Sequence, residues 1–165
     1  MKNIIQNIRR LFFDNSCTCC GEKASDNLIY LCYNCLDKIV RQKSLNKVGD
    51  TYYIWPYKGE FRKLLLEYKN NSRLALGKII SSLIEEEIFK VVYEEDIDYI
   101  VPIPINFRRE QIRGFNQVEE ILKNLNYSFL KTNRVKNTKK MFKILDKEKR
   151  ENNIKNSFKV DKEFK

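Results

Sequence analysis

The sequence contains no histidine, and it has only 3 prolines and 5 glycines in 165 residues. The absence of histidine excludes Ser-His-Asp and Cys-His catalysis and every His-ligated metal site. Any metal must therefore be held by thiolates or carboxylates. The sequence also has no run approaching the ~20 apolar residues of a membrane span, and polar residues interrupt the signal-peptide pattern in residues 1–10. These absences predict a cytoplasmic protein, in which thiols stay reduced.

Positive charge is concentrated in the last quarter of the chain. The whole sequence has 32 Lys and Arg against 22 Asp and Glu, which gives a net charge of +10 at pH 7. Residues 123–165 alone hold 14 basic and 5 acidic side chains. Such a segment would attract a polyanion such as nucleic acid, although a solvated lysine-rich face is the alternative. The candidate contacts to a single strand are Lys136, Lys139, Lys140 and Lys143.

Apolar periodicity predicts alternating strands and helices after Asp50. Aromatic and β-branched residues predict a strand over 51–57, and an apolar run closed by two prolines predicts another over 98–105. Helical spacing predicts helices over 61–68, over 76–91 after a cap at Asn71-Ser72, and after Gly114, with weaker strands at 127–130 and 157–160. This alternation is typical of an α/β domain over residues 51–165, which follows a small module over residues 1–50.

Four of the five cysteines form two Cys-x-x-Cys pairs, Cys17 with Cys20 and Cys32 with Cys35. In each pair a tight turn points both sulfurs to one side, so two turns can place four thiolates tetrahedrally around Zn²⁺. Four Cys ligands leave no open position, so this zinc would be structural. Buried reduced cysteines and a redox pair are the alternatives. Cys19 is expected to be a bystander.

Basic residues surround the turn that follows the Val-Pro-Ile-Pro segment at residues 101–104. In open α/β sheets, ligands collect where loops leave the carboxyl ends of strands, and a helix amino terminus there favours an anion. An arginine in such a loop can grip phosphate in a forked geometry, while a glycine lets the backbone approach. A solvated basic connection is the alternative. The candidate phosphate-binding residues are Arg108, Arg109, Arg113, Gly114, Asn116 and Gln117.

The order of these motifs resembles the ComF family of competence proteins. The cysteine pairs come first, then Val-Pro-Ile-Pro, then Arg-Gly-Phe-Asn-Gln at residues 113–117, then Arg150-x-Asn152 ahead of a Phe. That family joins a zinc ribbon to a type I phosphoribosyltransferase-like domain. The resemblance implies a Rossmann-like parallel sheet, incomplete at its carboxyl end, after a zinc-ribbon module with four cysteine ligands.

The resemblance also implies ligands and partners. It places Arg113, Gly114, Asn116 and Gln117 in a phosphate or pyrophosphate region and makes Arg150 and Asn152 part of a later signature. Phosphoribosyl diphosphate is the ligand expected of intact relatives. Single-stranded DNA and the DNA-uptake machinery of natural competence are the expected partners. The family's Asp-Asp and Thr-Thr-Gly loop is expected just beyond Val160, whereas the sequence given stops at Lys165.

Three functions follow as expectations. The first is a phosphoribosyltransferase-like domain that binds phosphate or sugar phosphate, for which the sequence assigns no catalytic residue. The second is an accessory that binds single-stranded nucleic acid, in which aromatic residues of the first strand would stack on bases. The candidates for stacking are Tyr52, Tyr53, Trp55 and Tyr57. The third is a truncated or decayed family member without activity.

Overall fold

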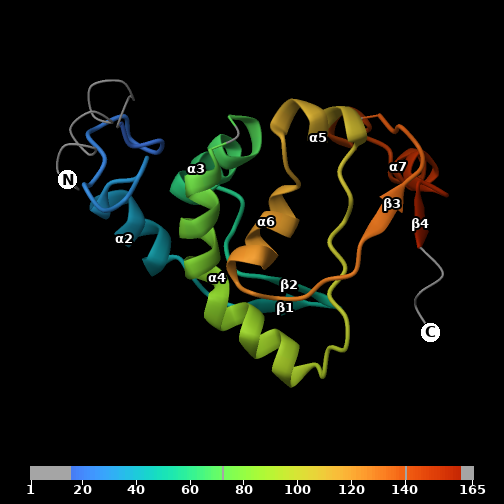
Figure 1. Ribbon diagram of the computed structural model, residues 1–165, viewed down its shortest axis with the longest axis horizontal. Helices are drawn as coiled ribbons and strands as arrows, with labels where there is room; N and C mark the ends of the chain where they lie inside the picture. Colours follow the sequence, from blue (N-terminus) through green and yellow to red (C-terminus); the bar gives the residue numbers. More distant parts are fainter. Residues whose placement is uncertain (1–15, 72, 140, 161–165) are drawn as a thin grey trace. The chain divides into compact units, whose positions relative to one another are not determined.

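A computed structural model of the chain describes residues 16–71, 73–139 and 141–160 (Figure 1). Helices and short strands both occur, so the expected mixed α/β class is confirmed at that level. The chain divides into two compact units, Met1–Val91 and Val92–Lys165, at a point inside one long helix. Each unit is therefore described by itself. The predicted boundary near Asp50 lies within the first unit and stays a prediction.

The first unit is built from helices around one short hairpin. Its elements are α2 (Tyr33–Arg41), β1 (Asn46–Val48), β2 (Thr51–Tyr53), α3 (Gly59–Asn70) and most of α4 (Leu74–Glu94). The predicted helices over 61–68 and 76–91 are confirmed as α3 and α4. Asn71, expected to cap α4, instead ends α3 by donating its N–H to the Glu67 carbonyl, and Ser72 lies outside the described residues.

The predicted strand over 51–57 is confirmed only in its first half. β2 ends at Tyr53, and it pairs in antiparallel with β1, so that Val48 lies opposite Thr51. Pro56 cannot donate a ladder hydrogen bond, which is consistent with an early end to the strand. The partner strand β1 was missed because its Asn-Lys-Val sequence carries little apolar signal.

One tryptophan links α2 to α3 in the first unit. The indole N–H of buried Trp55 donates to the Ile39 carbonyl of α2 at 2.8 Å. Its ring stacks on Phe61 of α3, with ring centroids 4.2 Å apart. The Lys43 ammonium group, which follows α2, also lies 2.9 Å from a Glu87 carboxylate oxygen on α4. These contacts join the cysteine-bearing end of the unit to its helical core.

The second unit begins with an extended segment that runs from the end of α4 to α5. Its elements are α5 (Phe107–Arg113), α6 (Gln117–Asn124), β3 (Thr132–Arg134), the 3₁₀ helix η1 (Met141–Lys143), α7 (Lys147–Ile154) and β4 (Phe158–Val160). β3 and β4 pair in antiparallel, and Arg134 lies opposite Phe158. The predicted helix after Gly114 is confirmed as α6, and the predicted strand over 157–160 as β4.

The described residues contain no parallel sheet, so the expected Rossmann-like sheet is not found there. All named strands belong to two antiparallel pairs. Residues 98–105 are extended but form no strand, because Pro102 and Pro104 remove two ladder donors from this short run. The segment makes one backbone contact with the predicted strand over 127–130, from the Leu130 N–H to the Ile100 carbonyl at 2.9 Å. Residues 127–130, predicted as a strand, form none, and the strand in this part of the chain is β3, which begins at Thr132.

None of the described helices combines the length and the apolar character that crossing a membrane requires. α4, which spans Leu74–Glu94, is the longest of them. Four carboxylate side chains interrupt its apolar sequence, namely Glu85, Glu86, Glu87 and Glu94.

Replacing Gly77 with Ala is expected to lower the free energy of unfolding of the first unit by about 1–3 kcal/mol through overpacking. An added Cβ would lie 3.0 Å from the Tyr68 hydroxyl oxygen and 3.1 Å from its Cε2 atom. Tyr68 is only 2% exposed, so its ring is enclosed by neighbouring atoms that would have to shift with it. The better helix propensity of Ala offsets up to about 1 kcal/mol. Urea unfolding followed by circular dichroism measures the change, and the exposed neighbour variant Lys78→Ala is the control. Equal stabilities for both variants would contradict this packing.

Candidate metal centre and arginine cluster

The four predicted ligand cysteines converge in the first unit. The Sγ atoms of Cys17, Cys20, Cys32 and Cys35 all lie within 4.8 Å of one another, which confirms the predicted cluster. Three of these residues are buried, and Cys20 is exposed. All four thiols are free, so the cluster is not a pair of disulfides. Four sulfur donors gathered at this spacing fit a closed metal site of the structural type.

Two tight turns bring the sulfurs together. In the first turn the Gly21 N–H donates to the Cys17 carbonyl at 2.8 Å, and Gly21 adopts a φ of 81°, which a residue without a side chain reaches at no steric cost. In the second turn Cys32 caps α2, and its Sγ accepts from the Cys35 N–H at 3.4 Å. The Thr18 N–H donates to the Tyr30 carbonyl at 2.9 Å, which holds the two turns side by side.

The electrostatics of the cluster favour a bound cation. Burial opposes ionisation of Cys17, but backbone N–H groups of the two turns outweigh it and lower the pKa of this thiol to about 6. Burial and the neighbouring thiols raise the pKa of Cys35 well above its usual range. Cys17 is therefore ready to bind as a thiolate, while the raised pKa values of Cys20 and Cys35 oppose their ionisation beside it. A divalent cation removes that penalty, because coordination deprotonates a thiol.

Cys19 does not belong to the four-sulfur cluster. Its buried thiol donates to the Glu60 carbonyl of α3 at 3.4 Å, and the Lys63 ammonium donates to the Cys19 carbonyl at 2.6 Å. Burial is the main cause that raises the pKa of Cys19 to about 11, so the thiol stays protonated at neutral pH. Cys19 thus anchors the first cysteine turn to α3, a role that sequence spacing did not indicate.

In the second unit, two asparagines and one glycine shape the predicted phosphate loop. The Asn106 side chain caps α5 by accepting from the Arg108 N–H at 3.1 Å, and Asn116 caps α6 by accepting from the Val118 N–H at 3.1 Å. Gly114 ends α5 with a φ of 81° in the left-handed region. Asn116 is buried, and its amide nitrogen donates to the Glu119 carboxylate. Among these predicted residues, Gly114 and Asn116 therefore end and begin helices, while the arginines supply positive charge.

A third arginine reaches this loop from β3. The Arg134 guanidinium donates to the Pro104 carbonyl at 3.5 Å, to the Lys136 carbonyl at 3.3 Å and to the Thr138 hydroxyl. The Asn106 amide also donates to the Asn137 side-chain oxygen. These contacts hold residues 134–138 beside residues 104–106, which precede α5. No motif marks Arg134, although it is the single arginine among the lysines of residues 131–143.

Arg109, Arg113 and Arg134 form what is called here the arginine cluster. Partial burial, and then the positive charge of Arg109, lowers the pKa of both Arg113 and Arg134 below the usual value. All three side chains are half-buried, whereas Arg108 is exposed. Within residues 16–71, 73–139 and 141–160, no carboxylate forms an ion pair with any of the three. In the described part of the chain, the cluster is therefore a concentration of positive charge without an ion-paired carboxylate.

The remaining predicted residues do not belong to the sulfur cluster or to the arginine cluster. Lys136, Lys139 and Lys143 are exposed, and Lys140 lies outside the described residues. On α7, the Arg150 side chain donates to the Ile144 carbonyl at 2.6 Å, and Asn152 is exposed. Gln117 is the first residue of α6. Of the aromatic residues expected to stack on bases, Trp55 is buried and Tyr52 half-buried, and the exposed ones are Tyr53 and Tyr57.

A comparison of the chain with protein-family models, with curated proteins and with solved structures finds no match. Function is therefore inferred from the geometry of the cysteines and the arginines.

The purified chain is expected to hold one Zn²⁺, which elemental analysis measures. Cys17→Ser and Cys32→Ser should each abolish stoichiometric binding, because each removes one of four ligands. Chelation should also shift the emission of the single tryptophan, Trp55, to longer wavelength, since metal binding contributes on the order of 10 kcal/mol to the folding of such modules. Cys19→Ser is the matched control and should retain the metal. Loss of zinc from Cys19→Ser but not from Cys17→Ser would show that the ligand set is wrong.

Proposed function

We propose that the second unit binds the phosphate group of a sugar phosphate or nucleotide at the arginine cluster. The observation that carries this proposal is the gathering of three half-buried guanidinium groups with no ion-paired carboxylate in the described part of the chain. Bringing like charges together is unfavourable, and an anion placed among them turns that repulsion into attraction. A phosphate suits this role because guanidinium groups bind it through paired, charge-assisted hydrogen bonds.

The cluster is partly organised before any ligand arrives. Arg109 and Arg113 are four residues apart on α5, so their side chains lie on the same face of that helix. Arg134 is held by its hydrogen bonds to the Pro104 carbonyl and the Thr138 hydroxyl. Fixing a guanidinium in advance reduces the entropy lost on binding. Binding is proposed rather than catalysis, because the side chains gathered here are cations and none can act as a general base.

The wider proposal is a ComF-like protein of natural competence, and it rests on the resemblance of the motif order. In this proposal the four cysteines hold a structural zinc in a cytoplasmic protein, and the arginine cluster is the phosphate region of a phosphoribosyltransferase-like domain. The clustered sulfurs support the zinc assignment, and Arg109 and Arg113 support the phosphate assignment. Arg134 extends the phosphate region beyond the residues that the motif contains.

A second candidate function is the binding of single-stranded DNA by the basic surface of the second unit. The observation that favours it is that exposed lysines follow the arginine cluster along the chain. Arg134 donates to the Lys136 carbonyl, and the side chains of Lys136, Lys139 and Lys143 are exposed. Lysine side chains on such a surface neutralise successive phosphates and release counterions. In this function the arginine cluster would hold one phosphate of the strand.

Arg113→Ala is expected to weaken the binding of ribose 5-phosphate and of inorganic phosphate by about 10-fold or more, since a charge-assisted hydrogen bond contributes about 1.5–3 kcal/mol. Arg134→Lys should also weaken binding, because lysine keeps the charge but loses the fork. Isothermal titration calorimetry measures both affinities. Arg108→Ala is the matched control on the same helix, and it should bind within about twofold of the unchanged chain, a difference of roughly 0.4 kcal/mol. Equal losses for Arg108→Ala and Arg113→Ala would refute a discrete site.

Replacing Lys136, Lys139 and Lys143 with Gln is expected to weaken the binding of single-stranded DNA and to flatten its salt dependence. Each phosphate contact contributes about 0.7 to the slope of log affinity against log salt, so the slope should fall by at most about 2. Fluorescence anisotropy over a salt series measures this change. A variant that changes three exposed lysines of the first unit, Lys47, Lys58 and Lys78, serves as the charge-matched control. The same fall in slope for both variants would argue against a specific strand path.

A further inference from the structure

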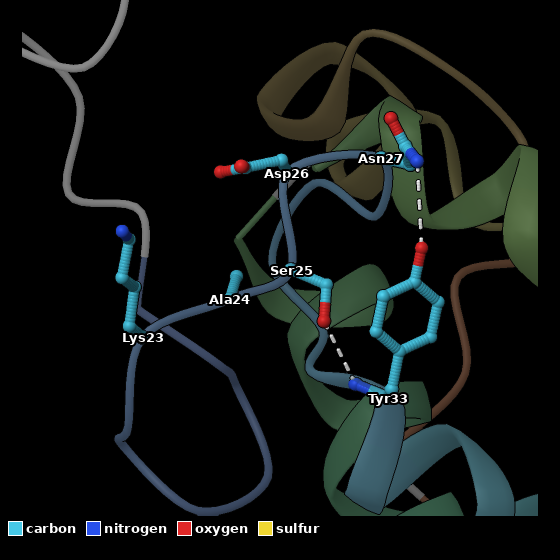
Figure 2. A pocket seen from close by; sticks show the side chains of 6 residues that line it. All are labelled: Lys23, Ala24, Ser25, Asp26, Asn27 and Tyr33. Atoms are coloured by element: carbon cyan, nitrogen blue, oxygen red, sulfur yellow. Dashed lines mark hydrogen bonds between the residues drawn. The ribbon is translucent and has the colours of Figure 1, made fainter.

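A hollow of about 400 Å³ opens on the first unit beside the second cysteine turn (Figure 2). Its volume lies within the range of small-ligand sites. The hollow is broadly open to solvent, and its lining combines polar and apolar surface in similar amounts, so it suits a ligand that stays partly exposed. The lining residues are Lys23, Ala24, Ser25, Asp26, Asn27 and Tyr33.

Tyr33 forms an aromatic wall of this hollow. It follows Cys32 at the start of α2, and 57% of its surface is exposed. Its N–H donates to the Ser25 hydroxyl at 2.9 Å, and its phenol oxygen accepts from the Asn27 amide at 3.4 Å. Figure 2 shows the ring standing beside Ser25 and Asn27, with Lys23 farther along the same loop. The cysteine turn thus presents an exposed ring in a defined place.

We infer that this hollow binds one base of a single-stranded nucleic acid. The face of Tyr33 offers a stacking surface, and stacking on an aromatic side chain is a main source of affinity in single-strand binders. The Asn27 amide and the Ser25 hydroxyl supply donors and acceptors for the edge of the base. The exposed ammonium group of Lys23 supplies a charge for the neighbouring phosphate.

The lining favours a nucleic acid over a peptide. A peptide anchor needs an apolar pocket, and the aliphatic side chain here is that of Ala24, which is small and 3% exposed. A flat base needs a ring and polar edge groups, which Tyr33 and Asn27 provide. The inference does not depend on the arginine cluster, because the hollow belongs to the first unit and the cluster to the second. Arg113→Ala should therefore leave stacking at Tyr33 unchanged.

The test uses the full, zinc-loaded chain and fluorescently labelled oligothymidylate and oligoadenylate. Tyr33→Ala is expected to lower the affinity at least about fivefold, whereas Tyr33→Phe, which keeps the ring, should bind within about twofold. Lys23→Gln should reduce the salt slope by about 0.7. Tyr93→Ala is the matched control, because Tyr93 is an exposed tyrosine of α4, at 78%, and does not line the hollow. It should leave the affinity unchanged.

Metal content and Trp55 emission are measured for each variant, because Tyr33 lies between two cysteines of the cluster. Asn27→Ala lies outside both Cys-x-x-Cys turns, so it tests the hollow even where Tyr33→Ala loses metal, and it should cost about two- to tenfold in affinity. Unchanged affinity in a metal-loaded Tyr33→Ala, or equal losses from Tyr33→Ala and Tyr93→Ala, would overturn the inference. Absence of binding to either oligonucleotide at low salt would also overturn it, and a peptide would then be the alternative ligand of the hollow.

Discussion

The convergence of four cysteine sulfurs is the constraint on which the first unit depends. The cluster fixes where α2 begins, because Cys32 is both a member of the cluster and the cap of that helix. The other end of α2 then offers the Ile39 carbonyl to Trp55, and Trp55 stacks on Phe61 of α3. A line of contacts therefore leads from the sulfurs to the helical core. The short cysteine segment could not hold this arrangement by apolar burial alone.

The second unit is organised in a different way, through caps and polar contacts. Asparagine side chains begin α5 and α6, and Asp146 begins α7 in the same manner. Few large side chains are fully buried there, and Leu122 is the main apolar one among the described residues. The arginine cluster is placed by the same kind of polar contact, since Arg134 donates to the Pro104 carbonyl and to the Thr138 hydroxyl. Anion binding would then add to the stability of the unit as well as define its function.

The features predicted correctly were local ones. The spacing of apolar residues was sufficient for α3 and α4, and the two Cys-x-x-Cys pairs were sufficient for the sulfur cluster. The errors concern contacts between distant segments. Residues 98–105 have the composition of a buried strand, but their two prolines leave no continuous ladder. Arg134 of β3 donates to the Pro104 carbonyl, just before α5. This contact joins segments that are thirty residues apart, and no periodicity in the sequence indicates it.

The place of the cysteines along the chain has a consequence for protein synthesis. All four sulfur donors lie within residues 17–35, so they leave the ribosome before Trp55 and Phe61 emerge from it. Closing these short loops costs little entropy, so the four sulfurs can come together while the rest of the unit is still being made. α2 would then be ready as a template when Trp55 emerges. A chain in which the sulfurs fail to come together would lack the cap of α2, so its tryptophan would have no helix to dock on, and such chains are prone to aggregation.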